Sequence, residues 1–258
     1  MGTGVVGFNL GAEDALMCDL NPHLIRFYEA LASSEITPPG VRGFLEKEGS
    51  LLSESGGEHY YAVRERFNEK HSPLDFLFLS RACFNGMIRF NRKGSFNVPF
   101  CKKRDRFGKA YVTKIVNQVD HLHRLFKLRS ITFKHQDFRN TIQEASDGDL
   151  IYCDPPYIGR HTDYYNGWNE DDEKSLFELL SETKSFFILS TWHHNSHREN
   201  LFIRKYWSKF NIHTREHFYH VGAREDNRNA VTEALITNFQ THASKPPLPV
   251  SEQLSLNL

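Results

Sequence analysis

A short motif, Asp-Pro-Pro-Tyr, stands at residues 154–157, directly after the apolar residues Leu-Ile-Tyr-Cys. Such an apolar run predicts a buried strand, and open α/β sheets bind ligands at the carboxyl ends of their strands. The two prolines fix φ and remove two backbone donors, so the turn is stiff and its carbonyl groups are free to accept hydrogen bonds. Asp154 adds an acceptor and Tyr157 adds a flat face. Together these residues suit a planar group that carries an amino group.

The exocyclic amine of adenine is such a group. It is a poor nucleophile, because its lone pair is delocalised into the ring. Two acceptors that hold its hydrogens favour a pyramidal nitrogen, whose lone pair is then free to attack a methyl sulfonium in line. No covalent enzyme intermediate is needed. The alternative interpretation is a rigid turn in which Asp154 only caps a neighbouring backbone group.

The chain opens Met-Gly-Thr-Gly-Val-Val-Gly, and these glycines have the G-x-G-x-x-G spacing of loops that wrap nucleotides. The spacing alone is a weak signal, because such a loop lies between a strand and a helix. Residues 5–11 can supply the first helical turns, but no strand precedes the loop in this sequence. A Gly-rich chain start without function is the alternative.

The composition is that of a globular protein without net charge. Its 258 residues include 32 Lys and Arg and 32 Asp and Glu, so affinity for nucleic acid must come from local patches. The four cysteines form no C-x-x-C pair, which argues against a disulfide framework and a zinc knuckle. No apolar run reaches the roughly 18 residues of a membrane span, and no secretory signal is seen. We therefore expect a cytoplasmic protein with reduced thiols.

Apolar runs that lead into helical patterns predict a doubly wound α/β sheet. Asn21 and Pro22 have the residue types of a helix N-cap and of a first helical position. Strands are expected at 15–20, 130–138, 149–157 and 185–192, helices at 22–33 and 169–182, and an antiparallel pair at 211–221 and 230–239.

The alternation stops between residues 38 and 127. An insertion of this size is more than a connecting loop, so we expect a small lobe with its own task. The block predicts helices at 59–69, 73–85 and 111–127 and a hairpin-like stretch at 87–100. The expected organisation is a catalytic domain at 1–37 and 128–240, a lobe at 38–127, and a flexible tail at 241–258, rich in Pro and Ser.

Residues 86–109 form a basic stretch in this neutral chain. They contain eight Lys or Arg residues and one acid, Asp105, a local net charge of +7. Aromatic residues are interleaved with the charges, which suits phosphate contacts combined with base stacking. The alternative is a solvated charged loop.

Three motifs, Asp-Pro-Pro-Tyr at 154–157, the glycine loop at 2–10 and the segment 84–100, resemble the Dam-type, or D12-class, DNA adenine-N6 methyltransferases of the alpha group. The resemblance extends to about residue 239. It implies a Rossmann-like sheet that binds S-adenosyl-L-methionine (SAM), with an inserted, mainly helical target-recognition lobe that contains the hairpin. It also implies methylation of double-stranded DNA, often beside an independently acting restriction endonuclease, with neither metal nor membrane involved.

In that family the glycine loop wraps the methionine part of SAM and not a pyrophosphate, so Gly7 serves packing only. Asp19 would accept from the ribose hydroxyls, with helix capping as its alternative role. Asp137 would accept from the cofactor's adenine amine, and Phe138 would pack on its ring or be an ordinary core residue. The implied cofactor residues are Gly2, Gly4, Asp19, Asp137, Phe138 and Asp154.

An adenine inside a duplex cannot reach Asp154, so the base must swing out at a cost of a few kcal/mol. The resemblance places an aromatic wedge at Phe84 and a guanine-reading guanidinium at Arg89, while Cys101 departs from the usual glycine and puts the recognised sequence in doubt. The implied catalytic residues are Asp154, Pro155, Pro156 and Tyr157. The implied DNA contacts are Phe84, Asn85, Met87, Arg89, Asn91, Pro99, Lys102 and Lys103.

The sequence departs from the family at its front. Relatives carry an upstream Lys and Gly segment and then a first strand that leads into the glycine loop, and neither is found here. Loss of a central strand from a parallel sheet exposes both neighbours, at about 25 cal/mol per Å² of apolar surface. We therefore expect an N-terminally shortened reading frame.

Other functions fit the residues less well. The nearest is amino methylation of cytosine N4, RNA or a protein glutamine. Cytosine-C5 chemistry needs a thiolate, usually in a Pro-Cys pair, and the chain has none. His193 and His197 have helical spacing but lack the H-E-x-x-H arrangement of metal-dependent hydrolases. A non-catalytic DNA-binding fragment is the remaining alternative.

Overall fold

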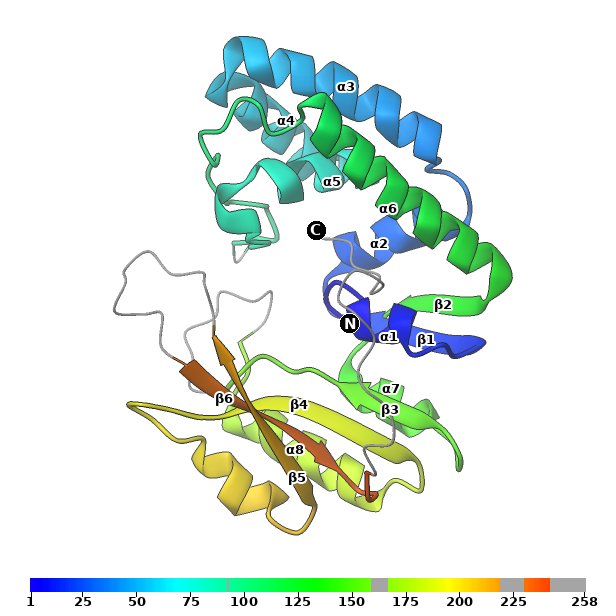
Figure 1. Ribbon diagram of the computed structural model, residues 1–258, viewed down its shortest axis with the longest axis vertical. Coiled ribbons are helices and arrows are strands. Elements are labelled where there is room, and N and C mark those ends of the chain that lie inside the picture. Colours follow the sequence, from blue (N-terminus) through cyan, green and yellow to red (C-terminus); the bar gives the residue numbers. More distant parts are fainter. Residues whose placement is uncertain (92, 159–166, 219–229, 242–258) are drawn as a thin grey trace. The chain divides into compact units, whose positions relative to one another are not determined.

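The computed structural model describes residues 1–91, 93–158, 167–218 and 230–241, which fall into two compact units (Figure 1). The first unit ends at Gln136 and the second begins at Asp137. Both contain helices and strands, so the expected mixed α/β class is confirmed. No helix in the described part of the chain combines the length and the apolar character needed to cross a bilayer.

The first unit contains most of the helices. In chain order its elements are α1 (Val5–Asn9), β1 (Asp14–Asp19), α2 (Pro22–Ala32), α3 (Pro38–Ser55), α4 (Gly57–Lys70), α5 (Pro73–Ala82), the 3₁₀ turn η1 (Phe84–Gly86), α6 (Lys109–Leu128) and β2 (Ser130–His135). The predicted cap of α2 is confirmed: Asn21 accepts from the amide of His23 at 3.0 Å, and Pro22 stands at the first helical position.

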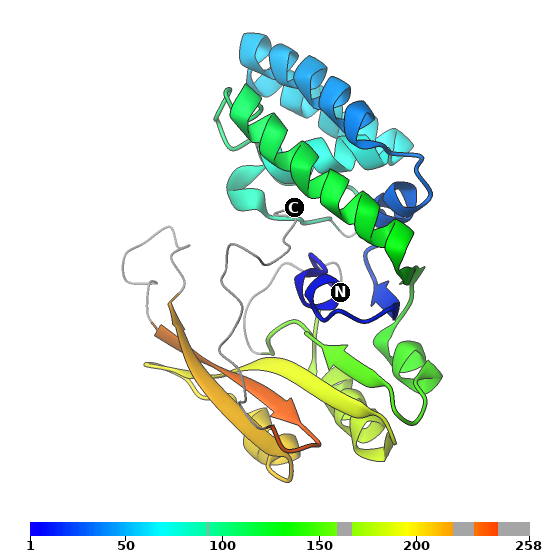
Figure 2. The ribbon, with the colours of Figure 1, turned by 45° about the vertical axis from the view of Figure 1, so that its right-hand side comes forward.

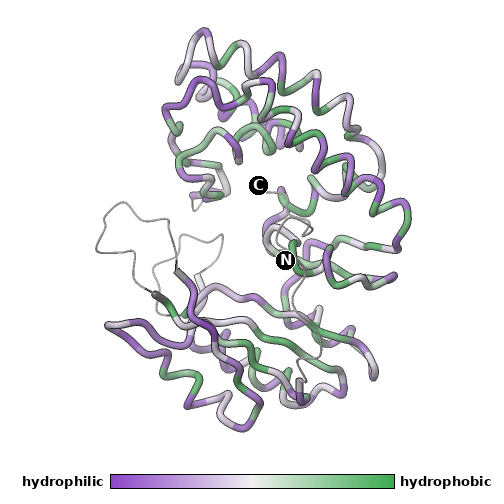
Figure 3. Tube along the Cα trace, in the orientation of Figure 1, coloured by the Kyte–Doolittle hydropathy of each residue, from purple (hydrophilic) through white to green (hydrophobic). Residues whose placement is uncertain are grey.

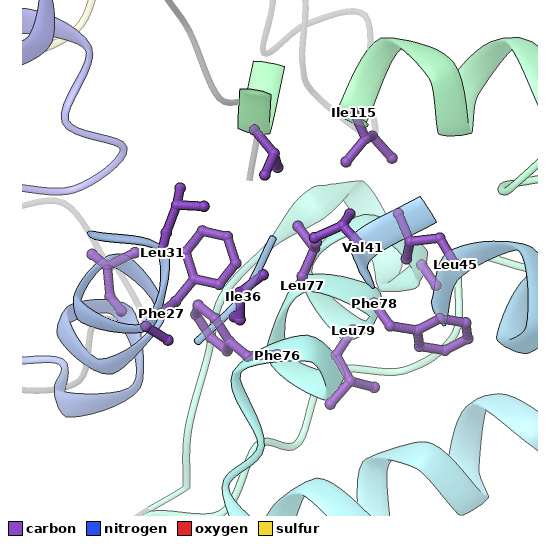
Figure 4. Packing of buried hydrophobic residues seen from close by; sticks show 14 of the residues in the cluster. Phe27, Leu31, Ile36, Val41, Leu45, Phe76, Leu77, Phe78, Leu79 and Ile115 are labelled. Carbon is purple, nitrogen blue, oxygen red and sulfur yellow. The ribbon is translucent and has the colours of Figure 1, made fainter. Parts of the chain in front are cut away.

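The helices of this unit enclose one apolar core. α3 packs along α6 and against α4, and α4 packs against α5, as both views show (Figures 1 and 2). Hydrophobic and hydrophilic residues alternate along α3 and α6 in Figure 3, as expected for helices that bury one side. Side chains from four helices meet in this core in Figure 4: Phe27, Leu31, Val41, Leu45, Phe76, Leu77, Phe78, Leu79 and Ile115.

Helix α3 was not predicted. Its sequence contains two prolines and several glycines, which lower helix propensity. The structure explains one of them: a Cβ on Gly49 would lie 2.5 Å from the Cβ of Phe107, so only glycine lets this ring pack against the helix. Val41, Leu45 and Leu52 bury the same side of α3. Tertiary packing therefore outweighs the weak local preference.

Strands β1 and β2 form a parallel pair, with Asp14 opposite Ser130 and Asp19 opposite His135. α1 lies close to β1, because a Cβ on Gly7 would approach the Met17 Cε to 2.8 Å. This contact supports the expected packing role of Gly7. Among the described residues, β1 is strand-paired with β2 alone.

The second unit is built on one four-stranded sheet. Its elements are α7 (Phe138–Glu144), β3 (Leu150–Cys153), α8 (Glu170–Glu182), β4 (Phe186–Asn195), the π turn η2 (Ile203–Trp207), β5 (Asn211–Phe218) and β6 (Ala230–Thr237). The strand order is β3-β4-β6-β5, with β3 parallel to β4 and the pairs β4–β6 and β5–β6 antiparallel. The predicted antiparallel pair is thus confirmed, while its connecting turn lies outside the described residues.

A second apolar core covers one face of this sheet. Leu176 and Leu180 of α8 pack on Phe187, Leu189 and Ile236 of the strands. The first turn of α8 is rich in acidic residues, and Asn169 forms a capping box with Asp172.

Several predicted elements differ from their expectation, and among them the helix predicted at 73–85 ends at Ala82. The strand predicted at 149–157 stops at Cys153, because Pro155 and Pro156 cannot donate to a ladder. The strand predicted at 130–138 stops at His135, and Asp137 caps α7 instead. In its described residues, the hairpin-like stretch at 87–100 has no regular strand and contains one isolated antiparallel bridge, between Phe90 and Phe96.

Candidate functional site

The Asp-Pro-Pro-Tyr motif lies at the carboxyl end of β3, as predicted. Asp154 is exposed at the first position after the strand, and the two prolines are half-buried. The hydroxyl group of Tyr157 donates to Oε1 of Glu233 on β6 at 3.0 Å. The carboxylate of Asp154 is therefore accessible, while Tyr157 is held against the sheet.

The surroundings of β3 disfavour charge on its last residues. Atoms crowded at the strand end desolvate the Asp154 carboxyl group and raise its pKa, although the side chain keeps an exposed surface, and the negative charge of Glu233 raises it further. Burial raises the pKa of Cys153 to about 12. A thiol with that pKa supplies no thiolate near neutral pH, which argues against cytosine-C5 chemistry at this residue.

The glycine loop has the backbone that its sequence predicts. Gly2 has φ +53° and Gly4 has φ +71°, conformations that L side chains rarely adopt. A Cβ on Gly4 would lie 2.4 Å from the ring of Phe8, whereas a Cβ on Gly2 would meet no atom within 4 Å. The Tyr28 hydroxyl fixes the loop by donating to the carbonyl of Thr3 at 2.9 Å. Open space therefore remains beside Gly2.

Asp19 lies beside this loop, at the end of β1. Its Oδ2 accepts from the terminal amine of Met1 and from the amide of Gly2, each at 3.0 Å, and its Oδ1 accepts from the amide of Asn21 at 2.8 Å. The N-cap of α2 is Asn21, so the alternative role of Asp19 as that cap is not what the structure shows. Within the first unit, the predicted cofactor residues Gly2, Gly4 and Asp19 thus lie together.

Asp137 and Phe138 lie at the start of α7 in the second unit. Asp137 is the N-cap, and its carboxylate accepts from the Arg139 amide at 2.8 Å and contacts the guanidinium at 3.3 Å. The guanidinium carbon of Arg139 lies 4.4 Å from the centroid of the Phe138 ring, and the ring of Trp168 lies 5.2 Å from it. Both predicted residues therefore have structural partners, and their role toward a cofactor stays a prediction.

The predicted DNA contacts lie on one segment of the first unit. Seven of the eight side chains are exposed: Phe84, Asn85, Met87, Asn91, Pro99, Lys102 and Lys103. Arg89 is half-buried, and its Nε donates to Oδ1 of Asn97 at 3.0 Å. Asn91 orders the local turn by accepting from the amides of Lys93 and Ser95. The segment thus presents aromatic and basic side chains to solvent.

Helix α4 holds this segment through residues that the sequence did not single out. Oδ1 of Asn68 accepts from the amide of Phe96 at 2.8 Å, and its Nδ2 donates to the carbonyl of the same residue at 3.2 Å. The hydroxyl of Tyr60 donates to the carbonyl of Val98 at 2.7 Å. After α5, the backbone of Cys83 forms an isolated antiparallel β-bridge with Phe100. Only tertiary structure brings these distant residues together, so no local signal could have identified them.

The histidine cluster at the end of β4 shows no metal-binding arrangement. His193 and His194 face each other with their Nδ1 atoms 2.9 Å apart, and a bulge interrupts the strand between Trp192 and His194. In the described part of the chain, no three His, Cys, Asp or Glu residues are grouped so that they could hold a metal ion.

Comparison with known proteins bears on the identity of the chain. The family model of D12 class N6 adenine-specific DNA methyltransferases matches residues 1–221. The type II methyltransferase M.FokI of Planomicrobium okeanokoites is 28% identical over 92% of the chain, which spans 38% of that relative. The type II methyltransferase M1.LlaDCHI of Lactococcus lactis subsp. cremoris is 26% identical over 93% of the chain and 84% of its own length.

A further relative has a higher identity to the chain. The DNA adenine methylase of Vibrio cholerae serotype O1 is 30% identical over 78% of the chain and 73% of its own length. The family match includes both the glycine loop and the Asp-Pro-Pro-Tyr motif. The motif directly follows β3, and the glycine loop precedes α1 and β1. The chain therefore belongs to the D12 class N6 adenine-specific DNA methyltransferase family.

Proposed function

We propose that the protein transfers a methyl group from SAM to N6 of an adenine that has swung out of duplex DNA. The observation that carries this proposal is the accessible carboxylate of Asp154 in a stiff Pro-Pro turn at the carboxyl end of β3, with Tyr157 held beside it. The expected Rossmann-like domain and target-recognition lobe belong to the same proposal. Their support is the family match and the strand order of the second unit.

The residues present fit SAM. Gly2 has open space beside a backbone that only glycine adopts easily, and the half-buried carboxylate of Asp19 lies next to it. When bound, SAM supplies an activated methyl group. Gly2 and Gly4 would allow its methionine part to approach the backbone, and Asp19 would accept from its ribose hydroxyls at the position that the Met1 amine now occupies.

At the target base, the adenine amine would donate one hydrogen bond to Asp154 and one to the carbonyl group of Pro155. Tyr157 would stack on the ring and offset part of the few kcal/mol that base flipping costs. Alignment of the amine with the methyl group supplies much of the acceleration, on the order of 7–11 kcal/mol at best. Asp154 thus orients the nitrogen and needs to form no covalent bond.

The DNA is proposed to lie against the segment at 84–103. Phe84 would act as the wedge, Arg89 would read a guanine edge, and Lys102 and Lys103 would contact phosphates. The named type II relatives favour a role in restriction and modification, with an endonuclease that acts independently.

Product analysis tests the proposal. The full-length protein is incubated with labelled SAM and either duplex DNA or RNA, and the methylated nucleosides are identified by mass spectrometry. We expect N6-methyladenine in DNA and no other product. N4-methylcytosine, methylated RNA or no SAM binding in calorimetry would support one of the alternative functions instead.

A further inference from the structure

A single cross-strand pair holds the chain at the end of the Asp-Pro-Pro-Tyr motif. The hydroxyl of Tyr157 donates to Oε1 of Glu233 at 3.0 Å, and Nε1 of Trp192 donates to the carbonyl of Ile158 at 3.0 Å. Trp192 and Glu233 are directly opposite each other in the antiparallel β4–β6 ladder. Two neighbouring strand positions therefore fix both the side chain of Tyr157 and the backbone of the next residue.

The two anchors differ in their surroundings. Trp192 and Ile158 are buried, at 5% and 8% exposure, so their hydrogen bond is shielded from water. Glu233 is half-buried, and its neighbour Ala234 points into the apolar core under α8. Because side chains alternate along a strand, Glu233 lies on the face opposite that core. This face receives the segment that leaves β3.

An acid at this strand position has a cost. Strands favour β-branched and aromatic residues, and a half-buried carboxylate loses hydration. The charge of Glu233 also raises the pKa of Asp154, which works against the charged acceptor. A residue with only a packing role would carry neither cost. The carboxylate accepts the hydrogen bond from Tyr157, and Arg215 stands directly opposite Glu233 in the β5–β6 ladder.

We propose that Glu233, supported by Trp192, is a positioning residue that holds the Tyr157 ring in place for stacking on the target adenine. This inference rests on the proposed function and adds a residue to it. The phenolic oxygen lies on the axis of the Cβ–Cγ bond, so this hydrogen bond fixes the tip of the ring and restricts its swing about the Cα–Cβ bond before the base arrives. Small errors of alignment are costly, because a displacement of about 1 Å can lower the rate by about 100-fold.

Four variants of the full-length protein test this role. Glu233→Ala removes the acceptor, Tyr157→Phe removes the donor, the double variant removes both, and Glu233→Gln keeps an acceptor oxygen without the charge. Leu235→Ala is the matched control, since this residue lies on the same strand and the same face and is 46% exposed. Thermal unfolding and steady-state adenine methylation are measured for each.

We expect Glu233→Ala and Tyr157→Phe each to lower kcat by about tenfold while the KM for SAM stays unchanged. The double variant should be no slower than the slower single variant, because both remove one contact. Glu233→Gln should recover most of the lost activity, and Leu235→Ala should behave like the wild type. The melting temperatures of the first two variants should likewise be non-additive.

Three results would overturn the proposal: additive losses in the double variant, wild-type kcat in Glu233→Ala, or no recovery in Glu233→Gln. The melting temperatures of the two single variants and the double variant test this inference independently of the proposed function. If the wild type methylated no adenine, the proposed function would fail. Additive melting temperatures would still reject the Tyr157–Glu233 contact, and non-additive ones would support it.

Discussion

At the scale of single residues, the carboxyl group of Asp154 has conflicting requirements. It is exposed enough to meet a ligand, yet desolvation and the charge of Glu233 raise its pKa above the ordinary value of 3.8. Its deprotonated form is the stronger hydrogen-bond acceptor for an amine, so we expect the site to operate above this raised pKa. The desolvation of this carboxyl group therefore sets a lower pH limit on the site.

Methyl transfer should consequently decline on acidification, with a midpoint above 3.8. The stability of the fold depends on pH with the opposite sign. Because the pKa of Asp154 is raised in the folded state, its contribution to stability is fully present below its unfolded pKa. This contribution is lost as pH rises through the folded pKa. Glu233→Gln removes the neighbouring charge and should lower the midpoint. Single-turnover rates between pH 4 and 8 measure it, and a midpoint that did not move would contradict the assigned cause.

Removing the carboxylate should be more severe than shifting its pKa. We expect Asp154→Ala to lower turnover by roughly 10² to 10³, by analogy with the loss of one polar transition-state contact. SAM affinity should change little, because the glycine loop and Asp19 hold most of the cofactor in the proposed site. Turnover and calorimetric SAM binding are compared in the full-length protein. Unchanged turnover would exclude the proposed role.

At the scale of elements, the helices of the first unit are joined by a buried charge network. The guanidinium of Arg66 on α4 contacts Asp75 on α5 at 2.9 Å and Glu48 on α3 at 3.1 Å. Both carboxylates are nearly fully buried, at 2% and 3% exposure. His59 adds a second contact to Glu48 at 3.0 Å. One arginine thus links three helices.

Arg66→Ala should lower the free energy of unfolding by roughly 3 kcal/mol, because it leaves two buried carboxylates without their cation. This value is the low end for buried pairs, since the Arg66 side chain is itself 37% exposed. The control is Arg42→Ala, which removes an exposed contact to Glu46 and should cost less than about 1 kcal/mol. Urea unfolding of both variants provides the comparison, and equal losses would refute the network's importance.

The connection between α4 and the basic segment is a second element-scale feature. Asn68→Ala removes both hydrogen bonds to the backbone of Phe96 and should cost about 1–2 kcal/mol of stability. Affinity for duplex DNA should fall, because the segment at 84–103 loses its support, while SAM affinity should be retained. Asn117→Ala, on exposed α6 surface, is the control. Fluorescence anisotropy measures DNA binding, and equal affinity in both variants would disprove the link.

At the scale of the whole molecule, a neutral chain carries one strongly basic segment. The salt dependence of duplex DNA binding should therefore come from a few phosphate contacts of this segment and not from the net charge of the chain. Replacing Lys102 and Lys103 together by Ala should reduce the slope of log K against log salt by about two. Replacing Lys47 and Lys114, which are exposed on helices of the same unit, should leave the slope unchanged. An equal change in both double variants would argue against a localised interface.

Several expectations of organisation remain predictions. The domain boundaries at 37 and 127 are functional divisions that the two compact units do not test. The expected lack of the family's first strand also stays a prediction. Among the described residues, β1 is strand-paired with β2 alone and β3 with β4 alone. The tail from residue 242 onward lies outside the described residues.

Local chemistry determined what the sequence could reveal by itself. Two prolines must end β3, Asn21 and Pro22 must start α2, and glycines must supply the left-handed turns at Gly2 and Gly4, because each effect acts within a few residues. The family motifs then indicated the chemistry. These features need no knowledge of distant contacts.

Tertiary structure alone decided which distant residues support them. Helix α3 forms despite its glycines, because Gly49 admits the ring of Phe107, and Glu233 meets Tyr157 only through the pairing of β4 with β6. Such contacts join residues far apart in the sequence, and no local pattern encodes their partner. The sequence thus determined the reacting groups and the turns that present them, while long-range packing decided how firmly each is held.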